Sequence, residues 1–229
     1  MPSCLILCGG ANSRWNHHLG IERKHLIGVE GECLLQRTLG QVHAAGVAQP
    51  TVVINRGDGA HYAGRLEGNF DFLEIDPRPI GATEAWKFLS SRSCWNATGP
   101  TIVLLGDVWF SAAAIESIFA RQPSEWVAFG RAGASTFSGH PHGEIFAQRF
   151  ERHERHLEQL QRLDELYRAG LCQRTAGWAH YHLMIGAKPS MQCAGKDFCQ
   201  IDDFTELLMP EDLLSQTSIL AELRKVMTP

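Results

Sequence analysis

The fold is decided by two neighbouring stretches, Cys4-Leu-Ile-Leu-Cys-Gly-Gly-Ala-Asn-Ser-Arg14 and, ten residues after Arg14, Lys24-His-Leu-Ile-Gly-Val-Glu-Gly31. A short apolar run ends in two glycines, and a polar turn, an arginine and a lysine follow. In α/β domains a buried strand carries the chain to the sheet edge, and glycines let the backbone approach an anion that N–H groups and basic side chains neutralise. The stretch therefore indicates a phosphate site, although the glycines alone would also fit a plain turn after a core strand.

Length and composition are those of one globular α/β domain. The chain has 229 residues, of which 44% are hydrophobic and 20% are charged, so it can bury a core. Its net charge of −4 argues against a general nucleic-acid binder, which needs a broad basic face. The apolar runs are far shorter than the roughly 18–20 residues of a membrane helix, and the first one lacks the basic flank of a signal peptide. We therefore expect a soluble, cytoplasmic protein that binds neither membranes nor nucleic acid.

Cysteine and histidine spacings match no known zinc template. The seven cysteines include no Cys-x-x-Cys pair, so we expect reduced packing residues. Several of the eleven histidines come in pairs, such as His153 with His156 and His180 with His182. Imidazoles on the surface or in an active site explain them more simply than structural zinc.

Apolar runs alternate with amphipathic segments, which predicts a doubly wound, mainly parallel sheet. Strands are expected at 3–8, 51–54, 72–75, 101–105, 125–130, 144–150 and 177–186. Helices are expected at 34–45, 61–66, 112–121 and 154–168, for about ten residues after Gly81, and at 210–227. We expect a single domain, with a nucleotide-binding half at 1–124, an acceptor-binding region at 125–200 and a closing segment at 201–229.

The opening stretch resembles the signature of nucleotidyltransferases with a GT-A-like fold, especially the sugar-phosphate and choline-phosphate nucleotidylyltransferases. Their pattern is an apolar strand, G-G-x-G-x-R, about ten residues and then P-K-x-L-x-x-V-x-G-x-x-L-L. Residues 9–14 and 24–35 match it, and the step from Arg14 to Lys24 suits the sugar-phosphate branch better than the molybdenum-cofactor branch. Asn12 departs from the third glycine and Arg23 from the proline before the lysine.

This resemblance implies a Rossmann-like, mainly parallel sheet flanked by helices, with a smaller acceptor-binding lobe in the second half. It also implies two nucleotide-contact loops, formed by Cys8, Gly9, Gly10, Ala11 and Asn12 and by Gly81, Ala82 and Thr83. An ordinary strand-to-helix turn is the alternative for the second loop. Arg14 would neutralise the β- and γ-phosphates, and Lys24 would contact the α-phosphate and the acceptor phosphate.

A carboxylate follows the wholly apolar strand at 101–105, where parallel sheets bind ligands. By the resemblance, Asp107 would contact the nucleotide and hold Mg²⁺, which Mn²⁺ could replace, and Asp202 or Asp203 would supply a second metal ligand. The alternatives are an Asp107 that caps the helix at 112–121 and a late pair of ordinary loop carboxylates.

The acceptor site is expected in the second half of the chain. Trp109, Glu144 and Trp178 are its candidate residues by their positions, and Trp178, His180 and His182 would share one face of a strand. The leucine stripe of the helix at 154–168 would dock on the domain itself or, alternatively, form a homodimer.

The function implied is the transfer of a nucleotidyl group from a nucleoside triphosphate to a small phosphorylated acceptor, with release of pyrophosphate. One rival is a GT-A glycosyltransferase with a nucleotide-sugar donor, but such enzymes usually carry Asp-x-Asp where this chain has Gly106-Asp-Val-Trp109. The other rival is a catalytically weak module that only binds nucleotide. The departures from the signature at Asn12 and Arg23 would fit such a module.

Overall fold

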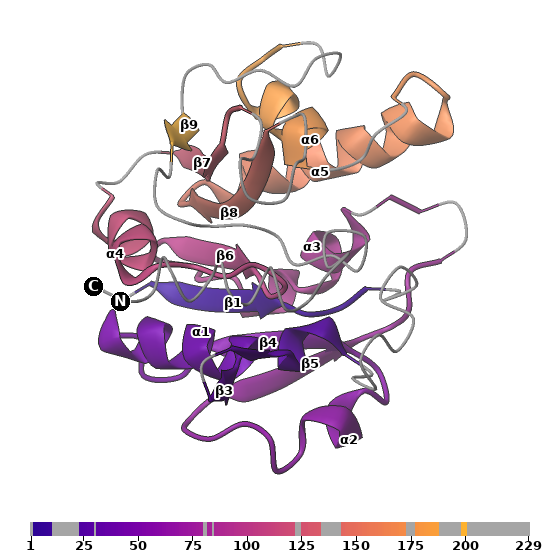
Figure 1. The fold of residues 1–229 in the computed structure, drawn as a ribbon. Helices are drawn as coiled ribbons and strands as arrows, with labels where there is room; N and C mark the ends of the chain where they lie inside the picture. The colour runs from indigo at the N-terminus through magenta and orange to yellow at the C-terminus, as the bar shows by residue number, and fades with distance from the viewer. Residues whose placement is uncertain are drawn as a thin grey trace.

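The chain folds into three layers, with helices on both faces of a central sheet (Figure 1). A computed structural model describes residues 2–10, 23–29, 31–79, 82–83, 85–121, 125–133, 143–172, 177–187 and 198–200. Within these residues, seven strands form one sheet in the order β5 (Asp71–Ile75), β4 (Thr51–Asn55), β1 (Ser3–Leu7), β6 (Thr101–Leu105), β8 (Glu144–Phe150), β7 (Trp126–Arg131) and β9 (Phe198–Gln200). Two short strands, β2 (Gly28–Val29) and β3 (Glu32–Cys33), pair separately.

The sheet is mainly parallel, as predicted. Strands β5, β4, β1 and β6 run parallel to one another. Strand β8 lies antiparallel to both β6 and β7, and β9 runs parallel to β7. Because β4, β1 and β6 are parallel neighbours, their carboxyl ends meet at one edge of the sheet, the edge where such folds bind ligands.

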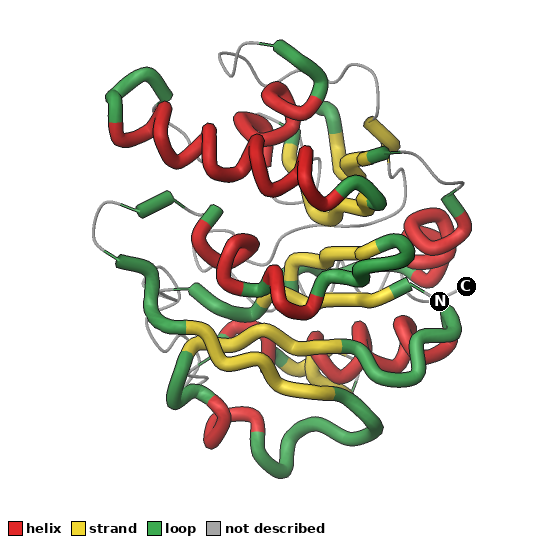
Figure 2. The backbone as a smooth tube through the Cα atoms, turned by 180° about the vertical axis from the view of Figure 1, so that it is seen from behind, coloured by secondary structure: helices red, strands yellow, loops and turns green. Residues whose placement is uncertain are grey.

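Alternate residues of the central strands enter two cores on opposite faces of the sheet. On one face, Ile6 and Leu104 pack with the helices α1 (Leu34–Ala44) and α4 (Ala112–Ala120). On the other, Leu5 and Val103 pack with α3 (Trp86–Ser90) and α6 (Gly177–Met184), and α5 (His153–Arg168) lies over these helices (Figure 2). The remaining short helices are η2 (Lys24–Leu26), α2 (Gly59–Tyr62) and η3 (Arg92–Cys94).

Side-chain caps and one glycine define the ends of the predicted helices. The Cys33 sulfur accepts a hydrogen bond from the Gln36 N–H at the start of α1, and Gly46 follows the helix with a φ of +93°. Ser111 caps α4 by accepting from the Ala114 N–H. Asp107 is therefore not the cap of α4, which removes one of the alternatives for this carboxylate.

The predicted strand at 177–186 is wrong, because residues 177–184 form helix α6. Six of its eight residues are buried, so the helix has no polar face and no helical periodicity that would distinguish it from a buried strand. The helix expected after Gly81 is also shorter, since α3 has five residues before η3. The predicted helices at 210–227 lie outside the described residues.

Most of the remaining elements match their predictions closely, but the helix expected at 61–66 begins earlier and is shorter, since α2 covers Gly59–Tyr62. Helix α5 covers the predicted segment at 154–168, and its Leu160 and Leu163 are buried against α3 and α6 within the same chain. Strand β8 covers 144–150 and pairs with β6 and β7 along its two edges, and both of its faces are buried, with Phe146 in one core and Ile145 in the other. No helix in the described part of the chain is long and apolar enough to span a membrane.

Candidate nucleotide site

The glycine turn and Asp107 lie at the edge formed by the carboxyl ends of β1, β4 and β6. The N–H of Cys8 donates to the Val53 carbonyl at 2.8 Å, and the N–H of Gly106 donates to the Leu7 carbonyl at 3.0 Å. These bonds extend the pairing of β1 past its end on both sides. Gly9 and Gly10 follow directly, so the structure brings the predicted phosphate turn to the predicted metal carboxylate.

Lys24 and Asp107 meet at this edge in an ion pair between Nζ and Oδ2. Their side chains are 15% and 17% exposed. Burial alone would raise the pKa of Asp107, but the charge of Lys24, with further contributions from His25 and Lys87, lowers this pKa to about 2. Asp107 is therefore an ionised carboxylate at neutral pH, and it lies against the lysine that we expect to bind phosphate.

The carboxylate of Asp107 is of a ligand type that suits Mg²⁺, and its metal role stays a prediction. This ion takes oxygen ligands and binds through one or two carboxylates together with substrate phosphates and water. Among the residues that the structure describes, no three His, Cys, Asp or Glu side chains lie close enough together to hold a metal ion. The proposed second ligands, Asp202 and Asp203, fall outside these residues, so their role stays a prediction.

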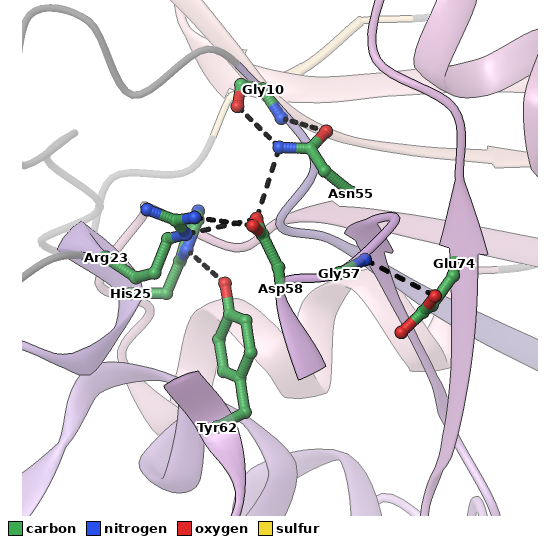
Figure 3. Close-up of polar contacts among 8 residues, drawn as sticks. All are labelled: Gly10, Arg23, His25, Asn55, Gly57, Asp58, Tyr62 and Glu74. Atoms are coloured by element: carbon green, nitrogen blue, oxygen red, sulfur yellow. Dashed lines mark hydrogen bonds and ion pairs between the residues drawn. The ribbon is translucent and has the colours of Figure 1, made fainter. Parts of the chain in front are cut away.

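An asparagine at the end of β4 holds the glycine turn. The Asn55 Oδ1 accepts from the Gly10 N–H at 3.2 Å, and the Asn55 Nδ2 donates to the Gly10 carbonyl at 2.8 Å (Figure 3). The same Nδ2 donates to Asp58 Oδ2 at 3.2 Å. Sequence reasoning missed both residues, although a polar cluster directly after an apolar strand of the predicted parallel sheet is the signal that could have identified them.

The residues on either side of Lys24 contact the turn that follows β4. Arg23 donates from Nε to Asp58 Oδ2 at 3.0 Å and from Nη2 to Asp58 Oδ1 at 2.5 Å. His25 Nδ1 lies 3.0 Å from the Tyr62 hydroxyl in a hydrogen bond. Burial lowers the pKa of His25 to about 3, so this imidazole is neutral at physiological pH.

The second predicted nucleotide loop is anchored to α5. Thr83 is buried, and its N–H donates to Asp164 Oδ1 at 3.1 Å. Its hydroxyl oxygen accepts from the Ala85 N–H at 3.2 Å. Ala82 is half-buried beside it. A nucleotide contact by this loop remains a prediction, as do those of Gly81, Ala11, Asn12 and Arg14, which lie outside the described residues.

The three acceptor candidates make separate contacts in the structure, and their role in acceptor binding stays a prediction. Trp109 is buried under α1, with the Arg37 guanidinium 5.0 Å from its ring centre. Glu144 faces Arg131 at 3.6 Å, and the indole N–H of Trp178 donates to the neighbouring Gly143 carbonyl at 2.7 Å.

Helix α6 also separates the three residues expected on one face. Trp178 and His182 have ring centres 6.2 Å apart, whereas His180 packs against Trp126 with ring centres 5.6 Å apart. The shared strand face is therefore wrong, because residues two positions apart point in different directions on a helix.

Family comparison identifies the class to which this fold and site belong. Residues 4–175 match the family described as MobA-like NTP transferase domain, and the chain belongs to this family. It is a nucleotidyltransferase, as the opening signature predicted. The description names no sugar-phosphate branch, so the preference based on the step from Arg14 to Lys24 is not confirmed.

Solved structures of low sequence identity share the fold over nearly their whole length. The inositol-1-phosphate CTP transferase of T. maritima is 12% identical, with a TM-score of 0.61 and coverage of 100% of this chain and 98% of its own. The CTP:phosphocholine cytidylyltransferase of Streptococcus pneumoniae is 10% identical, with a TM-score of 0.56 and coverage of 97% and 98%. The 4-diphosphocytidyl-2C-methyl-D-erythritol synthase of Anaerococcus prevotii is 14% identical, with a TM-score of 0.57 and coverage of 98% of each chain. A comparison with curated protein sequences found no match.

Proposed function

We propose that this nucleotidyltransferase joins a nucleoside triphosphate to a small phosphorylated acceptor, depends on Mg²⁺ and releases pyrophosphate. The observation that carries the proposal is the ion pair of Lys24 and Asp107 beside the glycine turn. A cation for phosphate and an ionised carboxylate for a metal then lie at one sheet edge, next to the glycine turn that the resemblance assigns to the triphosphate.

The chemistry needs charge and positioning more than a general base. An oxygen of the acceptor phosphate attacks the α-phosphorus in line, and the bond from that phosphorus to the bridging oxygen of the β-phosphate breaks. The bond electrons leave with pyrophosphate. A phosphate monoester is already anionic at neutral pH, so it needs no base to deprotonate it.

Each site residue has one task in this reaction. Gly9 and Gly10 hold the triphosphate against the backbone, and Lys24 faces the α-phosphate, where charge develops. Asp107 holds the metal, with Asp202 or Asp203 as its second ligand. Mg²⁺, when bound, supplies positive charge to the phosphate oxygens.

A phosphomonoester is the acceptor class that the comparisons favour. The relatives from T. maritima and S. pneumoniae are named for inositol-1-phosphate and phosphocholine, which share a phosphate group and little else. The glycosyltransferase alternative is disfavoured by the single carboxylate at 106–109 and by the lysine against it.

Thermal unfolding with ATP, CTP, GTP, UTP and dTTP, each with and without Mg²⁺, tests the proposal. A ligand that binds only the folded state raises the Tm by mass action. We expect one triphosphate to raise the Tm, Mg²⁺ to enlarge the shift, and Asp107→Ala to abolish that enlargement. A Tm shift with a nucleoside diphosphate sugar, and none with any triphosphate, would overturn the proposal in favour of the glycosyltransferase.

A further inference from the structure

The turn that follows β4 contacts the chain on both sides of Lys24 (Figure 3). Asp58 precedes the first residue of α2 and Tyr62 is its last, so one short turn presents both side chains. Arg23 binds the carboxylate through two nitrogens, and His25 binds the hydroxyl. Lys24, between them, extends instead to Asp107 at the end of β6.

The contact between Arg23 and Asp58 is a bidentate ion pair, the strong form of an arginine–carboxylate contact. Two N–H groups of one guanidinium reach the two oxygens of one carboxylate, which fixes direction as well as distance. The side chains are only 18% and 10% exposed, so water screens this pair less than an ion pair on the open surface. Asp58 also accepts from Asn55, which holds Gly10, so one carboxylate links the lysine segment to the glycine turn.

The backbone at Arg23 differs from that of the resembled pattern. The resembled pattern has a proline here, and proline restricts φ to about −65 ± 15°. Arg23 has a φ of −125° and a ψ of 119°, outside that range. No proline ring restrains the backbone before Lys24, and the contacts of Arg23 and His25 with the turn after β4 supply a restraint from their side chains.

We propose that Asp58 and Tyr62 are positioning residues, which hold Arg23 and His25 so that the Lys24 ammonium group is presented to the reacting phosphates. This inference rests on the proposed function for the role of Lys24, but the contacts themselves do not. A lysine held before substrate arrives loses less freedom on binding, and a displaced one stabilises the transition state poorly.

Four variants and one control test the inference. Arg23→Ala and Asp58→Ala each remove one partner, the double variant Arg23→Ala/Asp58→Ala leaves no unpaired charge, and Tyr62→Phe removes only the hydroxyl. Arg152→Ala is the control away from the site, because Arg152 also donates to a carboxylate, Glu125 Oε1 at 2.5 Å, in an exposed ion pair directly before β7.

The first readout is hydrogen exchange of the ligand-free protein, which needs no activity. The N–H of Leu26 donates to the Arg23 carbonyl at 2.9 Å and that of Ile27 to the Lys24 carbonyl at 3.2 Å, so these amides report on the segment. We expect exchange about tenfold faster in each variant, no faster in the double variant than in the singles, and unchanged in Arg152→Ala. Wild-type exchange in the variants would overturn the inference.

The second readout separates kcat from KM. Pyrophosphate release should show kcat lowered by about tenfold or more, with KM for the triphosphate changed by less than about threefold, because Lys24 is still present but misplaced in the transition state. Faster exchange with wild-type kcat would overturn the positioning role. If wild-type protein transfers no nucleotide, the proposed function fails while the exchange data still test the contacts.

Discussion

Lys24 and Asp107 neutralise each other in the ligand-free site, although we expect one to bind phosphate and the other to bind metal. A triphosphate alone must therefore separate the pair and approach an ionised carboxylate. In a triphosphate that carries a divalent cation, the phosphates offer Lys24 a negative charge and the cation offers Asp107 a positive one. The ion pair thus favours the metal complex of the nucleotide over the free nucleotide.

Asp107→Asn should reverse this preference. The variant removes the carboxylate that competes for Lys24, so a triphosphate in EDTA should bind about three- to tenfold more tightly than it binds wild type. Its affinity in Mg²⁺ should fall, because the metal ligand is lost. Calorimetric titration with and without EDTA measures both effects. Weaker binding than wild type in EDTA would contradict the competition.

Lys24→Met should lower kcat for pyrophosphate release by about 10² or more, because the methionine keeps the length of the side chain and loses its charge. The Tm of the variant shows whether the fold survives. Turnover near that of wild type in a folded variant would show that Lys24 has no catalytic role.

Gly106→Ala should destabilise the protein, because a Cβ at this position would overlap the Cys8 sulfur and lie 3.1 Å from the Leu7 carbonyl. Overpacking of this kind costs about 1–3 kcal/mol. Cys8→Ala in the same chain should restore part of the loss by removing the sulfur. Gly40→Ala is the comparison without a clash: nothing lies within 4 Å of its Cβ position, and alanine inside α1 should stabilise the protein by about 0.5–1 kcal/mol. Urea unfolding measures all four proteins, and equal stability of Gly106→Ala and wild type would show that the site backbone can shift.

Two buried histidines should make the protein sensitive to acid. The rings of His156 and His180 lie 4.8 Å apart, and neither ring has a hydrogen-bond partner within the described part of the chain. Burial lowers the pKa of His180 to about 3 and holds that of His156 well below its usual range, where the charges of His180 and His153 lower it further. The unfolded chain therefore binds more protons than the folded one below about pH 6.5. Stability is full above that pH and falls as the pH decreases.

Substitution of one histidine should flatten this dependence. Each histidine accounts for about 2 kcal/mol of stability lost between pH 7.5 and pH 5. In His156→Phe, whose ring can keep the stacking on Phe150, that loss should shrink by about this amount. Urea unfolding at the two pH values measures it, and His180→Phe repeats the test at the other ring. An unchanged loss in both variants would place the acid sensitivity elsewhere.

The parallel half of the fold was predictable because three of its four strands, β1, β4 and β6, carry uninterrupted apolar runs. The burial of 101–105 and the charge of Asp107 directly after it suffice to place a carboxylate at the ligand edge. The pairing of Arg23 with Asp58 was not predictable, because the sequence alone does not indicate which charged residue, 35 positions away, a given arginine will contact. Helix α6 was missed because a segment buried on most sides has no periodicity to separate helix from strand.

The place of β8 between β6 and β7 has a consequence for synthesis on the ribosome. Until residue 150 has emerged, β6 pairs only with β1, and its other edge is open. The residues along that edge include Ile102, Val103 and Leu104, all buried in the finished protein. An open, apolar strand edge is a template for pairing with other chains. Chains that stall or are cut near residue 121 should therefore aggregate, and chaperones should be needed most during the interval in which β7 has been made and β8 has not.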